Sequence, residues 1–155
     1  MNRKAIALAV GMFAAGSALA SDKSDIMAVL TQWNNPKDMT KSAASCANDA
    51  AIIDVIPPYE WHGPGACASF ARDYDAFVQK EGMTYEIGTI GKPTQFDIAG
   101  DRAYVSVAVT FRGTQKGKPV KNTGMMAFAL QKNVAGWQIT ALSWAMLTSN
   151  AFPEA

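Results

Sequence analysis

The sequence has few of the residues from which metal, redox and nucleotide sites are built. It contains one histidine, His62, and only two cysteines among 155 residues. A zinc site takes three or four histidine or cysteine ligands, so we expect no metal centre. There is no glycine-rich phosphate loop, no CxxC pair, and no serine or cysteine in a nucleophile motif. These absences leave the nucleotide-binding, redox and covalent hydrolase classes unsupported, and we expect no cofactor.

The sequence also lacks an apolar run long enough to cross a membrane. Residues 5–15 are all apolar or glycine, about half of the roughly 20 residues that a spanning helix needs. Two basic residues precede this run, and Ala18-Leu19-Ala20 places small residues where signal peptidase cleaves. We therefore predict that residues 1–20 are a signal peptide, that the mature chain begins at Ser21, and that it works in the periplasm or is secreted.

Neither sign of charge is in excess. The chain has 14 Lys and Arg against 13 Asp and Glu, and removal of Arg3 and Lys4 with the signal peptide leaves 12 against 13. A net charge near −1 gives no long-range attraction to nucleic acid or anionic lipid. We expect neither nucleic acid nor, after cleavage, a membrane as a partner. Residues 21–155 suffice for one domain with one core, and the sequence leaves a monomer or a homodimer open.

The two cysteines, Cys46 and Cys67, take their meaning from the predicted export. In an oxidising compartment an even pair is a candidate disulfide, and closing a loop of about 20 residues contributes roughly 3 kcal/mol in the chain-entropy model. Spacing does not establish the geometry that a disulfide needs, so two buried thiols remain the alternative.

Periodicity predicts helices in the first half of the chain and strands in the second. Helices are expected over about 24–33, over 38–47, and from Gly63-Pro64 to a C-cap at Gly82. The β-branched run 51–56, stopped by Pro57-Pro58, predicts an early strand. Four further strands are expected over 83–90, 102–112, 122–132 and 137–147. This order predicts an α+β domain with helices on one face of an antiparallel sheet.

Several motifs, together with this order of elements, resemble exported SnoaL-like proteins of the NTF2-like family. The resemblance covers residues 24–147, and the motifs that carry it are Ile52-Ile53-Asp54, Pro58-Tyr59-Glu60-Trp61-His62-Gly63-Pro64-Gly65-Ala66-Cys67, Lys116-Gly117-Lys118-Pro119-Val120 and Gly136-Trp137-Gln138-Ile139-Thr140. It implies a cone in which about three N-terminal helices pack on a curved sheet and enclose a mostly apolar pocket. The fold hosts isomerases, cyclases, dehydratases and binding proteins, so it does not decide the function.

Asp54 is the first candidate for chemistry. By strand parity it shares a face with Ile52 and Ile56, where burial would raise the pKa of its carboxyl and make it a proton acceptor near neutral pH. Its segment also resembles the strand that carries the general base in ketosteroid isomerases of this fold. The positions of the two oxyanion donors of those enzymes fall near Val29 and Phe128, whose side chains cannot donate a hydrogen bond. The alternative is that Asp54 accepts backbone amides at the Pro57-Pro58 turn.

His62 is the second catalytic candidate, with Asp54 or Glu60 as its partner; the alternative is a histidine bonded to the backbone where the helix begins. Aromatic rings that carry an N–H or O–H suit a pocket that grips an apolar ligand by one polar end. We expect Phe70, Phe77 and Phe111 to be plain core. The ligand-binding candidates are Trp33, Tyr59, Trp61, Tyr74 and Trp144.

Two functions of different classes follow. The first is an exported module that binds a small apolar ligand in the cone pocket without chemistry. The second is an enzyme without a cofactor, of the isomerase, cyclase or dehydratase type, in which Asp54 or His62 moves a proton. The sequence favours the first because the expected oxyanion donors are missing.

Overall fold

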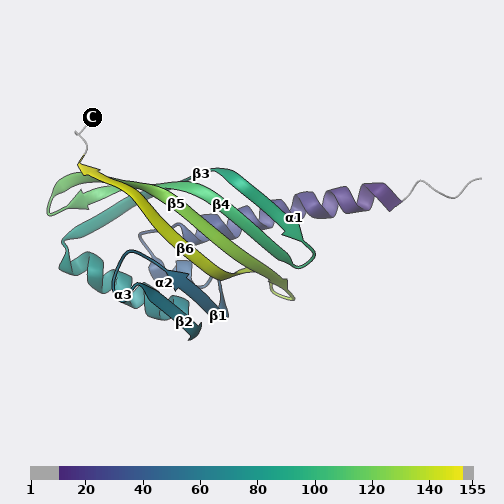
Figure 1. The fold of residues 1–155 in the computed structure, drawn as a ribbon, viewed down its shortest axis with the longest axis horizontal. Helices are drawn as coiled ribbons and strands as arrows, with labels where there is room; N and C mark the ends of the chain where they lie inside the picture. The colour runs from purple at the N-terminus through teal and green to yellow at the C-terminus, as the bar shows by residue number, and fades with distance from the viewer. Residues whose placement is uncertain (1–10, 152–155) are drawn as a thin grey trace, which may run out of the picture.

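The computed structural model describes residues 11–151, which form three helices and six strands. The elements are, in chain order, α1 (Gly11–Trp33), α2 (Met39–Ala43), β1 (Cys46–Ile53), β2 (Glu60–Pro64), α3 (Ala66–Lys80), β3 (Met83–Ala99), β4 (Arg102–Gln115), β5 (Lys118–Asn133) and β6 (Gly136–Ala151). Figure 1 shows four long strands that curve over the helices and the short strands β1 and β2. The predicted α+β class with three helices is confirmed.

The sheet has the strand order β2-β1-β6-β5-β4-β3. Every neighbouring pair is antiparallel except β1 and β6, which are parallel. Residues of β5 alternate between buried and half-buried from Val120 to Leu130, because successive side chains point to opposite faces. The buried face looks toward the helices and forms one wall of the core.

The helices complete the core with one apolar stripe each. Ile26, Leu30 and Trp33 of α1 are buried at the three- and four-residue spacing of a helical face. On α3, Phe70 is buried beside Cys67. A disulfide between Cys46 and Cys67 ties the start of β1 to α3, with the two Cα atoms 6.4 Å apart. The predicted bridge is thus present.

The second predicted helix ends earlier than expected, and the third begins later. The helix expected over 38–47 ends at Ala43, and β1 begins at Cys46, because the Ile139 amide donates to the Ser45 carbonyl and draws the chain into the sheet. The helix expected from Gly63-Pro64 begins at Ala66 instead. Residues 60–64 form β2, which had not been predicted, and pair with β1.

The strands also differ in extent from the predicted ones. β1 covers 46–53, so Asp54 follows the strand and does not lie within it as expected from the run 51–56. β3 continues from the predicted end at Ile90 to Ala99. Its register with β4 shifts around Pro93, which explains why residues 91–99 did not show a clean alternation of apolar and polar residues.

The first helix is longer than predicted. Helix α1 covers Gly11–Trp33 and so continues through the expected cleavage site before Ser21, with residues 18–20 exposed. Figure 1 shows this first part of α1 extending beyond the sheet. Asp22 ties α1 to the sheet: its Oδ1 accepts hydrogen bonds from Lys132 Nζ at 2.6 Å and Trp137 Nε1 at 3.0 Å. Residues 1–10 of the predicted signal peptide lie outside the described residues. Between Gly11 and Ala151, no helix has both the length and the apolar character required to span a bilayer.

Candidate functional site

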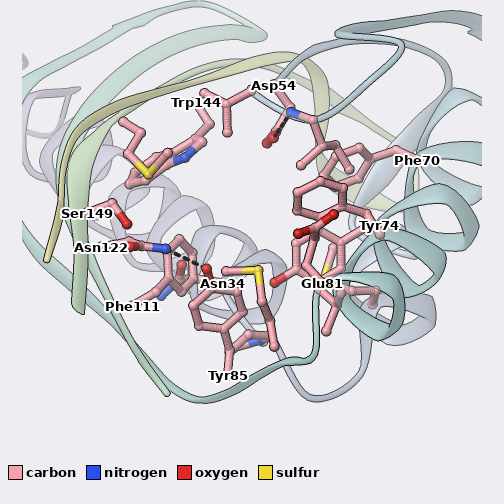
Figure 2. A pocket seen from close by; sticks show the side chains of 18 of the residues that line it. Asn34, Asp54, Phe70, Tyr74, Glu81, Tyr85, Phe111, Asn122, Trp144 and Ser149 are labelled. Carbon is pink, nitrogen blue, oxygen red and sulfur yellow. Dashed lines mark hydrogen bonds between the residues drawn. The ribbon is translucent and has the colours of Figure 1, made fainter. Parts of the chain in front are cut away.

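A cavity of about 270 Å³ lies between α3, the end of α1 and the inner face of the sheet. Figure 2 shows the side chains that surround it. Most are aromatic or aliphatic, and Val55 and Met146 are exposed, so they lie at its mouth. Its aromatic residues are Trp33, Phe70, Tyr74, Phe77, Tyr85, Phe111 and Trp144. Its polar residues are Asn34, Asp54, Glu81, Gln115, Asn122 and Ser149.

The aromatic rings form two arcs on opposite walls. On the helical wall, the Phe70 ring lies 5.8 Å from that of Trp33 and 5.9 Å from that of Tyr74. On the sheet wall, the Phe111 ring lies 5.8 Å from that of Tyr85 and 5.5 Å from that of Trp144. The cavity therefore presents flat apolar surfaces on two sides, as a pocket for an apolar ligand does.

Asp54 points into this cavity from the turn after β1 (Figure 2). Its Oδ1 accepts a hydrogen bond from the Ile56 amide at 3.2 Å, while its own amide donates to the Tyr59 carbonyl at 3.0 Å. Burial raises the pKa of the carboxyl from 3.8 to about 6, against the opposing effect of hydrogen bonds from the Ile56 and Val55 amides. Asp54 thus combines both predicted roles: it accepts a backbone amide at the turn, and it faces the pocket.

Tyr85 and Asn122 form a polar pair away from Asp54, on the sheet side of the cavity (Figure 2). The Asn122 Nδ2 donates to the Tyr85 hydroxyl oxygen, which leaves the phenolic hydrogen free to donate. Asn122 is 6% exposed, and its Oδ1 has no partner among the described residues. Burial raises the pKa of Tyr85, so this hydroxyl keeps its proton at neutral pH.

Two further polar groups lie on the wall formed by the helices. Burial raises the pKa of Tyr74, and the nearby charges of Tyr85 and Asp54 raise it further. Asn34 is 7% exposed and follows α1; its Oδ1 also lacks a partner in residues 11–151. The Nδ2 atom of Asn34 lies against Gly88: a Cβ added to Gly88 would be 2.7 Å from this nitrogen. The close approach of β3 thus fixes Asn34 in place.

Gly124 sets the shape of the sheet wall. A Cβ at this position would lie 2.2 Å from the Ala145 carbonyl oxygen and 2.6 Å from the Trp144 ring. Only glycine leaves room for the indole of Trp144 to lie across β5. The position of the Trp144 ring at the cavity therefore depends on a residue that does not line it.

The structure brings together some of the predicted site residues and separates others. Trp33, Asp54, Tyr74 and Trp144 line the cavity. His62 does not: its side chain is 60% exposed on β2, with Nε2 3.2 Å from Glu60 Oε2.

Tyr59 and Trp61 do not line the cavity either. Tyr59 is 59% exposed. Trp61 is buried behind the wall, where it packs edge-on against Phe70 at 4.9 Å and donates from Nε1 to Asp73 at 2.9 Å. His62, Tyr59 and Trp61 are close to Asp54 in sequence, but they do not lie in the same site.

Sequence reasoning missed part of the site. Phe70 lies in the core and Phe77 and Phe111 pack against it, as expected, but all three also line the cavity, which was not predicted. Asn34, Tyr85 and Asn122 were not singled out. A signal for Asn122 was present: it shares strand parity with Met126 and Phe128, which are buried, so it is a polar residue on an inward-facing position.

The described residues contain no group of three or more His, Cys, Asp or Glu side chains that is arranged to hold a metal ion. The polar groups of the cavity can accept and donate hydrogen bonds, and Asp54 can accept a proton. The arrangement can therefore bind a ligand and transfer a proton.

Solved structures show which known fold this is. An NTF2-like protein with a cystatin-like fold from Novosphingobium aromaticivorans matches with a TM-score of 0.71 and 17% identity over 88% of this chain and 92% of that chain. A ketosteroid isomerase-like protein from Erwinia carotovora atroseptica matches with a TM-score of 0.64 and 20% identity over 84% of this chain and 96% of that chain. A type 2 hexachlorocyclohexane dehydrochlorinase (LinA) matches with a TM-score of 0.69 and 11% identity over 90% of this chain and 93% of that chain. No family model matches the chain, and no curated protein matches it in sequence. The chain has the NTF2-like cone fold, as the resemblance predicted.

Proposed function

We propose that this NTF2-like cone binds a small, largely apolar molecule in the cavity between α3 and the sheet. The observation that carries the proposal is the pair of aromatic walls around a cavity of about 270 Å³. The expected ligand is one aromatic ring, or an equivalent apolar body, with a short polar substituent.

The four tryptophans provide a built-in test by NMR. Trp33 and Trp144 line the cavity, whereas the indole N–H groups of Trp61 and Trp137 donate to Asp73 and Asp22 elsewhere. Titration with single-ring aromatic probes should shift the indole N–H signals of the first two and leave those of the other two unchanged. Equal shifts of all four signals, or none, would contradict binding in this cavity.

A cavity-filling variant gives a second test with a matched control. Val78 lines the cavity, and Val134 is fully exposed in the turn between β5 and β6. Val78→Phe should weaken probe binding by more than tenfold because the added ring takes up space that the probe needs. Val134→Phe makes the same chemical change away from the cavity and should bind the probe as the parent does.

The second candidate function is proton transfer on a bound carbonyl compound. Asp54 would accept a proton from the carbon beside the carbonyl, and the Tyr85 hydroxyl would donate to the carbonyl oxygen. The observation that favours this reaction is a carboxyl whose pKa lies near neutrality in the same cavity as free hydroxyl donors. The dehydrochlorinase and the ketosteroid isomerase-like protein of the same fold support considering a reaction here.

The test of proton transfer is hydrogen exchange into a candidate ligand. Deuterium from D₂O should enter a bound aryl ketone at the carbon beside its carbonyl, and Asp54→Asn should abolish the exchange. Binding that persists in Asp54→Asn without exchange would separate the two functions. Exchange at the same rate in the variant would contradict Asp54 as the base.

We also propose that the domain is exported with residues 1–20 as its signal peptide, to the periplasm or outside the cell. Exposure of residues 18–20 supports this, because a signal peptidase must reach the chain at that point. The side chain of Asp22, two residues after the expected cleavage site, is tied to the sheet. Cleavage before Ser21 would therefore keep that anchor.

A further inference from the structure

We propose that the occupant of the cavity is an organic ammonium ion: an apolar body of about one ring that carries a positively charged amine. This inference rests on the proposed binding function and names its ligand class. It follows from two independent features of the same cavity: the sign of the charges on its lining residues and its aromatic walls.

The ionisable residues that line the cavity favour a cation. Asp54 and Glu81 both contribute carboxylates, and none of the lining residues is lysine, arginine or histidine. An anionic ligand would thus lose its hydration in the cavity without gaining a positive partner, which is costly in a low-dielectric site. A cation would instead find a carboxylate that burial has left without a cationic partner. The interactions that counter the effect of burial on the pKa of Asp54 are hydrogen bonds from the Ile56 and Val55 amides.

The aromatic walls favour a cation as well. Trp33, Phe70 and Tyr74 form one arc, and Tyr85, Phe111 and Trp144 form the other. A cation near the face of such a ring is attracted by its quadrupole, and the attraction grows when the cation is desolvated. Opposed rings with a carboxylate nearby are the arrangement in which proteins recognise alkylammonium groups.

The test compares two probes of equal shape. Benzyldimethylammonium and isobutylbenzene have the same heavy-atom skeleton, with N–H in the first where the second has C–H. At pH 7 the ammonium probe should bind the full mature chain at least tenfold more tightly than the hydrocarbon, as followed by the Trp33 and Trp144 indole N–H signals. Asp54→Asn should remove this preference while still binding isobutylbenzene, which shows that the variant is folded and its cavity intact.

The pH dependence gives an independent check. The titratable side chains that share the cavity with Asp54 are Tyr74 of α3, Glu81 directly after α3, and Tyr85 of β3. Both tyrosines stay protonated at pH 5–7 because burial raises their pKa. With the pKa of Asp54 near 6, affinity for the ammonium probe should fall about tenfold from pH 7 to pH 5. Affinity for isobutylbenzene should not fall.

Each outcome decides something different. If isobutylbenzene binds as tightly as the ammonium probe, the ammonium inference is overturned while the proposed apolar binding stands. If neither probe binds, both are overturned. A preference for the ammonium probe that survives Asp54→Asn would overturn the pairing of the cation with Asp54.

Discussion

Asp54 should destabilise the folded protein at neutral pH. Burial raises the pKa of its carboxyl from 3.8 to about 6, and each pKa unit corresponds to about 1.4 kcal/mol, so the ionised form costs the fold up to roughly 3 kcal/mol. Well below pH 3.8 the carboxyl is protonated in the folded and the unfolded chain alike, and the cost is absent. It grows as the pH rises from about 3.8 to 6 and is complete above pH 7.

The neutral variant Asp54→Asn should therefore be more stable than the parent at pH 7.5. Its amide oxygen can still accept the Ile56 amide, so the turn keeps its hydrogen bond. We expect a gain of about 1–3 kcal/mol in the free energy of unfolding at pH 7.5, equal to a rise of roughly 3–10 °C in Tm, and little gain at pH 4. Urea unfolding of both proteins at pH 4, 5, 6 and 7.5, followed by tryptophan fluorescence, measures this difference.

A matched control separates this effect from a general loss of negative charge. Asp49 lies exposed on β1, and Asp49→Asn should change stability by less than about 0.5 kcal/mol at either pH. The reasoning is refuted if Asp54→Asn is as stable as the parent, or less stable, at pH 7.5. That result would mean that the backbone amides around Asp54 stabilise the carboxylate by more than its burial costs.

Three further outcomes are expected. N-terminal sequencing of exported protein should begin at or near Ser21, and an intact Met1 on folded, exported protein would contradict the signal peptide. Intact mass with and without reductant should show Cys46 and Cys67 joined, and Cys67→Ser should lower the free energy of unfolding by about 3 kcal/mol. Gly124→Ala should destabilise the fold by about 1–3 kcal/mol and weaken probe binding, because its methyl group collides with the backbone and ring that shape the sheet wall; unchanged binding would contradict that role.

The apolar pattern predicted the fold well because it is a local property. The stripe of α3 and the alternation of β5 could be read from neighbouring residues, and both are present. The short strand β2 was missed because Gly63 and Pro64 in five residues resemble a loop, and it is pairing with β1 that makes them a strand.

The site was harder to predict because it is made by residues far apart in the chain. Asp54 was found because a carboxylate in an apolar run stands out locally. Tyr85 and Asn122 meet only through the register of the sheet, across 37 positions of sequence. Conversely, Trp61 and His62 are adjacent in sequence but point to opposite faces of β2, so one is buried and the other exposed. Closeness in sequence did not imply closeness in the site.

Because β1 pairs in parallel with β6, the sheet can be completed only after the last strand has been synthesised. β1 belongs to the first third of the sequence, yet one of its two neighbours is the last strand, Gly136–Ala151. A growing chain that has reached only β5 leaves both β1 and β5 with an unpaired edge, which are templates for wrong pairing. Loss of the C-terminal strand, by a premature stop or by trimming, should thus prevent the two halves of the domain from joining rather than shorten the sheet by one strand.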